Sequence, residues 1–523
     1  MGIRGEPMIS ENPDFKRHAP QVFLYLLVPI VILGIVARTL GIFSDFWLDE
    51  IWTYFRLAPL KSPLEIFTRF TSDNNHCLNS LFMFVIGNTG HWYLYRLPSL
   101  VAGVLTIPLV WLATRKAGRI EACIATILAA SSYLLINFSS EARGYSLVIF
   151  FSIATYYLLE RCLDSAALRW RILLWICMGL GILSHLTFMF VMVAAVVWLP
   201  YAGFRKHERW TSIMRNWLAS FGVPAIALLF FCLLVVRRFK IVGGPPYDLT
   251  AVLAESISYL GGEGQIVSPL TTLWGAITLA LVVNALFLMW RKGRSEWFFL
   301  FIVVLAAPAT ALLIHKPEVL FVRYFLINIF FAYIALSCLL AELSRRKTAG
   351  MIATALFLLV FLAGNGFQTA RLLEYGRGGY REAIRFIGEN SNRNPITIAS
   401  DNPVRNGKVI DFYKPYLPPG KEVLFLDRYG SATPPLWFIR HIIGEPPEFS
   451  KGIKDIYGHE YALKKVCPYA GPSGWYWLLY RRMDAYPTTG IASDTMYFTN
   501  PPLPDLVQRR GFERVSGRSA GNK

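Results

Sequence analysis

Long apolar stretches dominate the first 370 residues of the chain. Most have about 20 residues, the length of helix needed to cross the hydrocarbon core of a bilayer, and the two on either side of His185 are shorter. Another apolar stretch, Leu78 to Gly87, is too short to cross and is predicted to be an interfacial helix. No small-residue cleavage site follows the first long stretch, which is therefore predicted to be an uncleaved anchor. The pattern predicts about eleven membrane-spanning helices, at 21–40, 95–114, 120–138, 144–163, 171–184, 186–203, 217–236, 271–290, 296–314, 321–343 and 349–367.

Basic residues gather in every second connection between these stretches. Sixteen Lys and Arg residues lie in five short connections, at 115–119, 161–171, 205–215, 291–294 and 345–347. By the positive-inside rule these connections face the cytoplasm. The tail 1–20 then lies on the cytoplasmic side, and the connections 41–94, 139–143, 237–270 and 315–320 lie outside. In a bacterial inner membrane the outer side is the periplasm.

The pattern changes at about residue 370. Strand-like segments at 395–399, 422–426 and 475–479 follow an amphipathic helix at 380–388, and strands and helices at this spacing predict a small α/β domain. The last predicted span delivers this domain, 370–483, to the outer side. Residues 484–523 are rich in Pro, Gly and Arg and are predicted to be a loosely ordered tail. The expected fold is thus an α-helical polytopic membrane domain at 21–369 with a C-terminal extracytoplasmic α/β domain.

The composition supports a membrane protein. Of the 523 residues 54% are hydrophobic and only 16% are charged, whereas soluble domains have about a quarter charged residues. The net charge of +18 lies mostly among the apolar stretches, where it reports topology and not nucleic-acid binding. Seven cysteines form no disulfide framework, and no CxxC or HExxH metal motif is present.

An acidic pair, Asp49 and Glu50, follows the first span and lies between Trp47 and Trp52. The tryptophans have the usual role of anchoring a helix end at the interface. Carboxylates near the hydrocarbon boundary are costly to desolvate, and residues that bear this cost tend to be functional. The alternative is a solvated pair that caps a helix.

Three further polar groups lie on the predicted outer side. The first is the run from Asp73 to Ser80, which contains His76 and also reads as an ordinary turn. The second is the short connection with Glu141 and Arg143, where an arginine at a helix start opposes the helix dipole and needs another partner. The third comprises Lys316, Glu318, Arg323 and Tyr324.

Five motifs in this order resemble those of the GT-C membrane glycosyltransferases. The branch is that of the protein O-mannosyltransferases and the bacterial transferases that add aminoarabinose or galacturonate to lipid A and lipopolysaccharide. Relatives commonly have His-Pro-Pro where this chain has His76-Cys77-Leu78. The motifs are Trp47-Leu48-Asp49-Glu50, Asn74-Asn75-His76, Tyr95-Arg96-Leu97-Pro98-Ser99, Glu141-Ala142-Arg143-Gly144-Tyr145 and Arg323-Tyr324-Phe325-Leu326.

The resemblance implies a glycosyltransferase that takes its sugar from a polyprenyl-phosphate donor on the outer side and inverts the anomeric carbon. Asp49 then matches the general base, and Glu50 orients Asp49 or a backbone amide. Arg143 and Arg323 are the main candidates for the donor phosphate, because a guanidinium fork matches phosphate oxygens at two points. Further candidates for donor binding are His76, Lys316, Tyr324 and Glu141.

Sugar, acceptor and metal stay open from the sequence. The acceptor is lipopolysaccharide or lipid A, another glycan or a protein. Asp49, Asp73 and Glu141 supply carboxylates enough for a divalent cation, but no motif demands one. A transporter or flippase of lipid-linked sugars is the alternative function, and a sensor that acts through its outer domain is a third. Neither rival needs the carboxylate pair at one face of the membrane.

Overall fold

The computed structural model describes residues 13–483 and 495–497, except 166, 241–246, 265–267, 316–318, 347 and 445–448. The described chain forms two compact units. The first contains residues up to Phe43, Arg56–Lys240 and the chain on to Leu373. The second contains Ser44–Phe55 and the chain from Glu374. Each unit is a fold by itself, and the segment with the acidic pair groups with the second unit.

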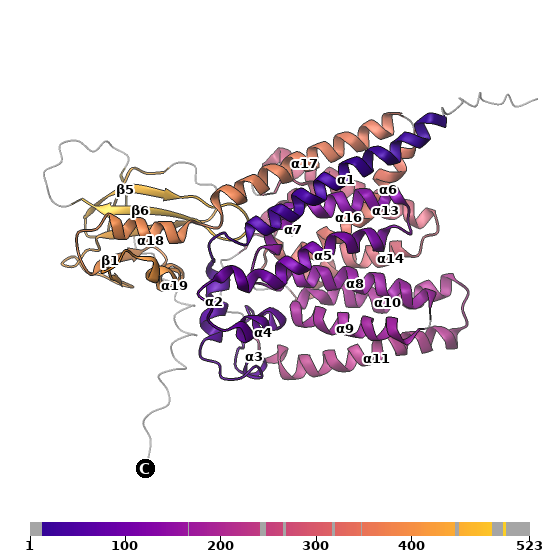
Figure 1. Cartoon of the computed structure of the whole chain (residues 1–523), viewed down its shortest axis with the longest axis horizontal. Coiled ribbons are helices and arrows are strands. Elements are labelled where there is room, and N and C mark those ends of the chain that lie inside the picture. The colour runs from indigo at the N-terminus through magenta and orange to yellow at the C-terminus, as the bar shows by residue number, and fades with distance from the viewer. Residues whose placement is uncertain are drawn as a thin grey trace, which may run out of the picture. The chain divides into compact units, whose positions relative to one another are not determined.

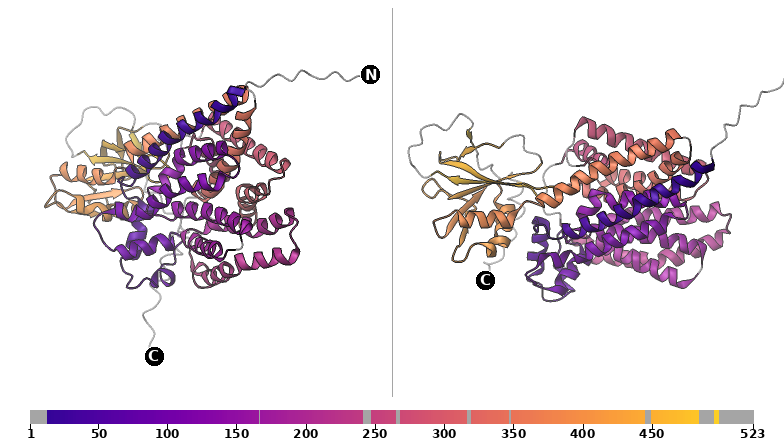
Figure 2. Two further views of the ribbon diagram at one scale, coloured as in Figure 1. Left: turned by 45° about the vertical axis from the view of Figure 1, so that its right-hand side comes forward. Right: turned by 45° about the horizontal axis from the view of Figure 1, so that its top comes forward.

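The first unit is a helix bundle (Figures 1 and 2). Its short helices are α3 (Glu65–Thr68), α4 (Cys77–Ile86) and α12 (Leu249–Gly261). Its longer elements are α1 (Pro13–Gly41), α5 (Leu97–Thr114), the pair α6 (Arg119–Ser131) and α7 (Tyr133–Ser139), α8 (Tyr145–Asp164), α9 (Leu168–Ser184), α10 (Met189–Arg205), α11 (Trp210–Leu234), α13 (Pro269–Arg291), α14 (Glu296–Phe301), α15 (Ala307–His315), α16 (Leu326–Arg345) and α17 (Thr348–Tyr375), which ends in the second unit.

Among the described residues, nine helices are long and apolar enough to cross a membrane, or ten if the bent pair α6 and α7 is one span. A multi-pass membrane protein is thereby confirmed, but the predicted count of eleven is not. The difference is the expected span 171–184, which corresponds to α9 and has only 17 residues. The predicted interfacial stretch is α4, a ten-residue apolar helix too short to cross.

Local sequence explains several helix starts. Ser268 caps α13 in a reciprocal capping box with Thr271, and Pro269 occupies the first turn, where a missing N–H has no cost. Asp248 caps α12 through the amide of Thr250. Several apolar side chains of α11, such as Ile226 and Leu229, are more than half exposed, as expected of a helix that faces lipid. By contrast, α16 is buried along nearly its whole length at the centre of the unit.

The helices α6 and α7 are separated by a sharp bend of 56°. Arg38 of α1, fully buried, donates to the carbonyl oxygens of Ala130 at 2.8 Å and Ala129 at 3.0 Å. On the other side of the bend, the amide of Tyr133 donates to Asn365 Oδ1 at 2.7 Å. Backbone groups that lose their helical partners in an apolar interior need other hydrogen bonds. Side chains of α1 and α17 supply them and so stabilise the bend.

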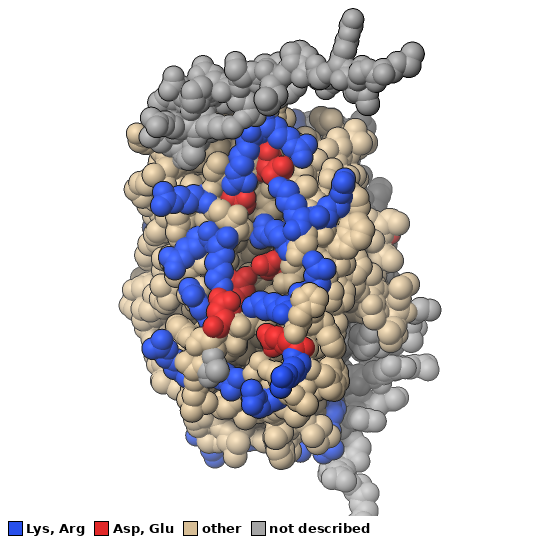
Figure 3. Space-filling view, turned by 90° about the vertical axis from the view of Figure 1, so that its right-hand side faces the viewer, with Lys and Arg blue, Asp and Glu red and all other residues tan. Residues whose placement is uncertain are grey.

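The five basic connections meet at one end of the bundle. Lys116 pairs with Asp164, and Lys206 lies 3.9 Å from the same carboxylate. Arg205 donates to the carbonyl of Gly293 at 3.2 Å. Two further ion pairs, Lys292 with Glu342 and Arg345 with Glu121, complete the chain of contacts. We call this surface the basic end; Figure 3 shows its Lys and Arg side chains around fewer acidic ones.

The second unit contains a seven-stranded mixed sheet in the order β2-β1-β3-β6-β5-β4-β7. Strand β1 pairs in parallel with β2 and β3, and β3, β6, β5 and β4 run antiparallel in turn. The expected strands and the helix at 380–388 are present. The elements are α2 (Leu48–Leu57, mostly in this unit), α18 (Tyr380–Glu389), β1 (Ile396–Ser400), α19 (Pro403–Tyr413), β2 (Val423–Phe425), β3 (Trp437–Ile442), β4 (Gly452–Lys454), β5 (Glu460–Cys467), β6 (Tyr476–Arg482) and β7 (Thr495–Tyr497).

Helices α18 and α19 cover the face of the sheet that carries Trp437 and Trp477. Phe386 of α18 packs against Trp437, and Asn406 of α19 accepts a hydrogen bond from Trp477 Nε1 at 2.8 Å. Strand β7 pairs in parallel with β4 and lies beyond the expected end of the domain at residue 483. The boundary at 483 is therefore wrong for this strand; the rest of the expected tail lies outside the described residues.

Candidate functional site

The polar run before α4 is anchored by its asparagines. Asn75 Nδ2 donates to the carbonyl oxygens of Ile66 at 2.8 Å and Phe70 at 2.9 Å, which closes the loop on itself. Asn79, one turn into α4, donates to the carbonyl of Ala142 at 2.7 Å. The loop that carries His76 is thus attached to the short connection before α8, as two neighbouring outer connections require.

His76 lies buried against that connection. Its Nδ1 accepts a hydrogen bond from the amide of Gly144 at 3.0 Å, so the ring carries its proton on Nε2 when it is neutral. A Cβ at position 144 would lie 2.7 Å from this nitrogen and 1.9 Å from the carbonyl oxygen of Ser184. Glycine is therefore required there by close approach of two chain segments.

A second histidine, His185, completes a ring cluster that sequence reasoning did not assign to the site. Its ring centroid lies 4.9 Å from those of His76 and Tyr145 and 6.0 Å from that of Tyr324. His185 falls between α9 and α10, and its Nδ1 accepts from the amide of Thr187. The available signal was a polar residue that interrupts two apolar stretches.

Two arginines border the histidines. Arg143, 3% exposed, donates to Asn74 Oδ1, and its Cζ lies 5.6 Å from the Tyr145 ring centroid. Arg323 has its Cζ 4.1 Å from the Phe321 ring centroid and 5.9 Å from that of Tyr324. The structure therefore brings together four of the candidate donor-binding residues, Arg143, Arg323, His76 and Tyr324.

The cluster is electrically positive. Burial lowers the pKa of His76 well below its usual range, and the charges of Arg143 and Arg323 lower it further. Burial and the same two arginines lower the pKa of His185 to about 3. Both rings are neutral at physiological pH, so the positive charge rests on the guanidinium groups.

The two acidic candidates of this unit have partners of their own. Glu141, fully buried, accepts at Oε1 from Asn137 Nδ2 at 3.0 Å, and its carbonyl accepts from the amide of Arg143. Asp73 accepts from the Ser72 hydroxyl at 3.2 Å, and its amide donates to the carbonyl of Lys240 at 3.1 Å. Glu141 thus helps to shape the connection that carries Arg143, and Asp73 joins two outer connections.

Asp49 and Glu50 occupy the first turn of α2, in the second unit. Carboxylates there are favoured by the helix dipole. Glu50 is fully buried, and its Oε2 accepts from the amide of Trp47 at 3.1 Å, as a helix-capping carboxylate does. The carbonyl of Asp49 accepts from the hydroxyl of Thr53 at 2.9 Å. Glu50 is thereby engaged with the backbone.

Contacts within the second unit hold this segment on α19. The amide of Phe46 donates to the Tyr413 hydroxyl at 2.6 Å, and that hydroxyl donates to the Phe46 carbonyl at 2.9 Å. The ring of Phe412 stacks on Phe46 at 5.5 Å and meets Tyr54 edge-on at 5.6 Å. The acidic pair is therefore positioned by the C-terminal domain.

Arg405 of α19 is the charged neighbour of Asp49. Burial lowers the pKa of Arg405, and the negative charge of Asp49 acts in the opposite direction. The same guanidinium helps burial to lower the pKa of His441 to about 3. Sequence reasoning did not identify Arg405, because nothing in its surroundings along the chain separates it from a surface arginine.

Two predictions have no counterpart among the described residues, namely the charged residues Lys316 and Glu318 and a metal site. Lys316 and Glu318 lie outside the described residues. Among the residues that are described, no three His, Cys, Asp or Glu side chains come together as a metal site requires.

Residues 77–236 match a family model described as dolichyl-phosphate-mannose-protein mannosyltransferase. The match covers α4 to α11, and so includes Glu141, Arg143 and His185. It confirms the resemblance to the GT-C membrane glycosyltransferases that the motifs indicated. No curated protein matches the chain as a whole.

The solved structures that match this chain include two that were determined with a lipid phosphate. One is the oligosaccharyltransferase AglB from Archaeoglobus fulgidus with an inhibitory peptide and a dolichol-phosphate, at 14% identity and a TM-score of 0.46; the match covers 74% of this chain and 62% of that one. The other is ArnT from Cupriavidus metallidurans bound to undecaprenyl phosphate, at 12% identity and a TM-score of 0.47, with 88% and 98% covered. Likeness at this level assigns neither a residue nor a ligand to this chain.

Proposed function

We propose that the protein is a membrane glycosyltransferase. It transfers a sugar from a polyprenyl-phosphate donor to a hydroxyl outside the cytoplasm, on lipopolysaccharide or lipid A, another glycan or a protein. The observation that carries the proposal is the cluster of Arg143, Arg323 and two neutral histidines at the predicted outer ends of the helices, in which Arg143 and His76 are buried. Such a cluster fits an anionic phosphate that approaches from the membrane.

The donor chemistry agrees with this cluster. A phosphodiester on an isoprenoid tail needs apolar surroundings for the tail and cations at the boundary for the phosphate. The match to a family described by a dolichyl-phosphate-mannose donor supports a carrier of this class. Arg143 and Arg323 are the proposed phosphate ligands, because the guanidinium fork can donate twice to one phosphate. His76, Tyr324, Glu141 and Lys316 are proposed to assist donor binding.

The proposed reaction is a single displacement. The acceptor oxygen forms a bond to the anomeric carbon on the face opposite the phosphate, and the bond from that carbon to the phosphate oxygen breaks. The electron pair leaves with the polyprenyl phosphate, whose charge the arginines stabilise. Asp49 takes the proton from the acceptor hydroxyl, a service worth roughly 10²–10⁴ in rate. Inversion at the anomeric carbon follows.

Glu50 has a positioning role in this scheme. One of its oxygens holds the amide of Trp47 and so fixes the first turn of α2, on which Asp49 lies. Removal of the Glu50 charge should disturb transfer less than removal of the Asp49 charge, because no proton needs to pass through Glu50.

The decisive experiment is transfer by purified Asp49→Asn enzyme supplied with its lipid-phosphate donor. The variant keeps size and most hydrogen bonding but cannot accept a proton, so we expect transfer to fall by about 10²–10⁴ while folding persists. Glu50→Gln should fall less. A flippase of the same lipid would keep transporting in Asp49→Asn, so a liposome transport assay separates the two functions. Near-wild-type transfer would move the chemistry to another carboxylate.

Two further variants separate a lone base from a metal site. If Asp49 acts without a metal, Asp73→Asn should change transfer little, and Glu141→Gln should affect donor binding more than the chemical step. If the three carboxylates bound a cation, all three variants would fail together, and a chelator would abolish transfer by the wild-type enzyme.

A further inference from the structure

The basic end of the bundle encloses a chamber that the proposed transfer reaction does not use. Its volume is about 280 Å³. It lies where α5, α8 and α16 end, beside the connection from α13 to α14. Charged side chains of both signs line it, namely Lys116, Glu160, Arg294 and Glu296, together with the polar side chains of Tyr156 and Cys338.

Glu160 is the least satisfied of these groups. The residue is 8% exposed, and among the described residues its Oε2 has no hydrogen-bond partner. The nearest cation, Lys116 Nζ, lies 3.9 Å from this oxygen and is better placed toward Asp164. A buried carboxylate oxygen without a hydrogen-bond donor lowers stability by roughly several kcal/mol unless a ligand or water donates to it. The chamber thus offers an acceptor for a cationic N–H.

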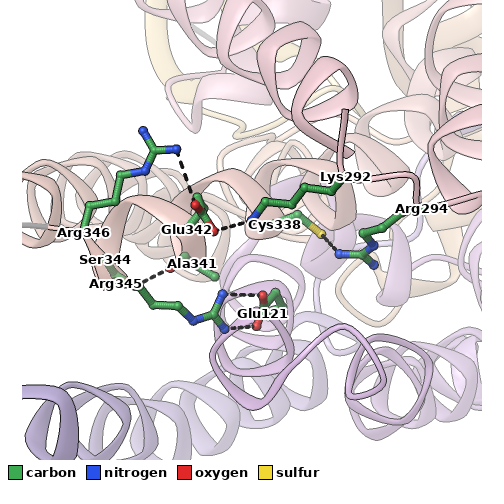
Figure 4. A network of polar contacts seen from close by, with 9 residues as sticks. All are labelled: Glu121, Lys292, Arg294, Cys338, Ala341, Glu342, Ser344, Arg345 and Arg346. Carbon is green, nitrogen blue, oxygen red and sulfur yellow. Dashed lines mark hydrogen bonds and ion pairs between the residues drawn. The ribbon is translucent and has the colours of Figure 1, made fainter. Parts of the chain in front are cut away.

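Arg294 is a second cation that lines the chamber. Its Nη1 donates to the thiol Sγ of Cys338 at 3.5 Å, as Figure 4 shows, and its Nε lies 3.8 Å from Glu296. A thiol is a weak acceptor, so a phosphate oxygen in the chamber would improve on it. Lys116 also lines the chamber, and its side chain is 42% exposed to solvent.

Other ion pairs at the basic end are closed on themselves. Arg345 donates to both oxygens of Glu121, at 2.7 Å and 2.6 Å, and Lys292 lies 2.5 Å from Glu342 (Figure 4). These pairs leave no comparable acceptor, and they do not line the chamber. The chamber therefore differs from its surroundings in having room and an unsatisfied carboxylate oxygen.

We propose that this chamber binds a zwitterion of the phosphoethanolamine class. Its primary ammonium donates to Glu160 Oε2, and its phosphate accepts from Arg294 and Lys116. The paired carboxylates and cations make the chamber suited to a ligand with both charges. Helix ends lie at the depth of lipid headgroups, which favours the headgroup of phosphatidylethanolamine over a free solute. The site is separate from the proposed donor site and adds a bound lipid to the protein's partners.

The test is binding to the purified full-length protein in detergent, measured by native mass spectrometry and by thermal stabilisation. The probes are phosphatidylethanolamine, phosphatidylcholine and phosphatidylglycerol with the same acyl chains, and soluble phosphoethanolamine. Phosphatidylcholine keeps the phosphate and the positive charge but has no N–H to donate. Phosphatidylglycerol keeps the phosphate and lacks the cation. Comparison of the three lipids on the wild-type protein therefore shows whether the ammonium N–H contributes to binding.

We expect phosphatidylethanolamine to bind about tenfold more tightly than the other two lipids, the effect of one charge-assisted hydrogen bond. Glu160→Gln should remove this preference, and Arg294→Gln should weaken all three lipids. Lys292→Gln breaks an ion pair of the same end outside the chamber and should change nothing. Competition by soluble phosphoethanolamine at matching concentration would identify the solute as the ligand. Equal affinity for the three lipids in the wild-type protein would overturn the proposal.

Discussion

Arg143 and Arg323 are the residues whose proposed role depends most on geometry. If each donates twice to the donor phosphate, Arg→Leu at either position should weaken apparent donor affinity by about 10–100-fold, the worth of one or two charged hydrogen bonds. Lysine at either position should restore part of the donor affinity, because it keeps the positive charge but cannot make the two-point contact of a guanidinium group. The measurement is the KM for the lipid donor.

The control for these variants is Arg238→Leu. Arg238 is exposed on another predicted outer connection and is not part of the histidine cluster. A general effect of positive charge on an anionic donor would lower affinity in this variant too. Unchanged KM in both Arg143→Leu and Arg323→Leu would make these arginines packing residues.

His441 makes the outer domain sensitive to acid. Its pKa is lowered to about 3, whereas the unfolded chain has the ordinary value of 6.5. Between these values the unfolded state binds the extra proton, so stability is lost as pH falls below 6.5, by about 1.4 kcal/mol per pH unit. Melting of the purified protein between pH 7.5 and 5 should therefore show a weaker pH dependence for His441→Gln.

The neighbouring Asp401 works in the opposite direction. Burial raises its pKa to about 6, so this group loses stability as pH rises from 3.8 towards 6. Its carboxylate accepts from the amide of His441 at 3.1 Å. Asp401→Asn should consequently steepen the acid loss. An identical melting profile for wild type and His441→Gln would show that the pKa of the imidazole is the same in the folded and the unfolded chain.

The residues found and missed from the sequence differ in where their partners come from. Arg143 and His76 belong to dense polar runs in outer connections, and such runs are visible in a linear pattern. His185 and Arg405 are single polar residues. Their interaction partners, the Tyr145 ring and the Asp49 carboxylate, come from distant parts of the chain. No local pattern contains that information.

At the scale of elements, hydropathy predicted where helices lie but not where one breaks. The stretch 120–138 reads as one span, while the structure bends it by 56° between α6 and α7. Ser131 and Ser132 at the bend are only weak signals. The stabilising partners are Arg38, 92 residues before Ala130, and Asn365 near the end of the bundle. Hydropathy cannot register such pairings.

The bend should depend on Arg38. Arg38→Met removes the donors to the carbonyl oxygens of Ala129 and Ala130, and each unsatisfied group costs about 1–3 kcal/mol. We expect a clearly lower melting temperature in detergent. Thr39→Ala is the matched control, because that hydroxyl is exposed and donates only to the carbonyl of Ile35 within its own helix. Equal melting of the two variants would mean that the bend holds without the guanidinium.

At the scale of the whole molecule, the basic end determines the predicted orientation of the chain in the membrane. Its five connections meet through ion pairs and hydrogen bonds, so they lie on the same side of any membrane that the bundle spans. By the positive-inside rule that side is the cytoplasm. The N-terminus and the connection 345–347 should then be cytoplasmic, and the domain after 370 should lie outside.

Cysteine labelling in intact cells tests this direction. Lys206→Cys places a thiol at the basic end and Val404→Cys places one on the outer domain, both at exposed positions. An impermeant maleimide should label the cysteine at 404 in intact cells and the one at 206 only after the membrane is opened. The wild-type chain, whose described cysteines are buried or half-buried, gives the background. Labelling at 206 but not 404 in intact cells would invert the topology and remove the outer-side donor from the proposed mechanism.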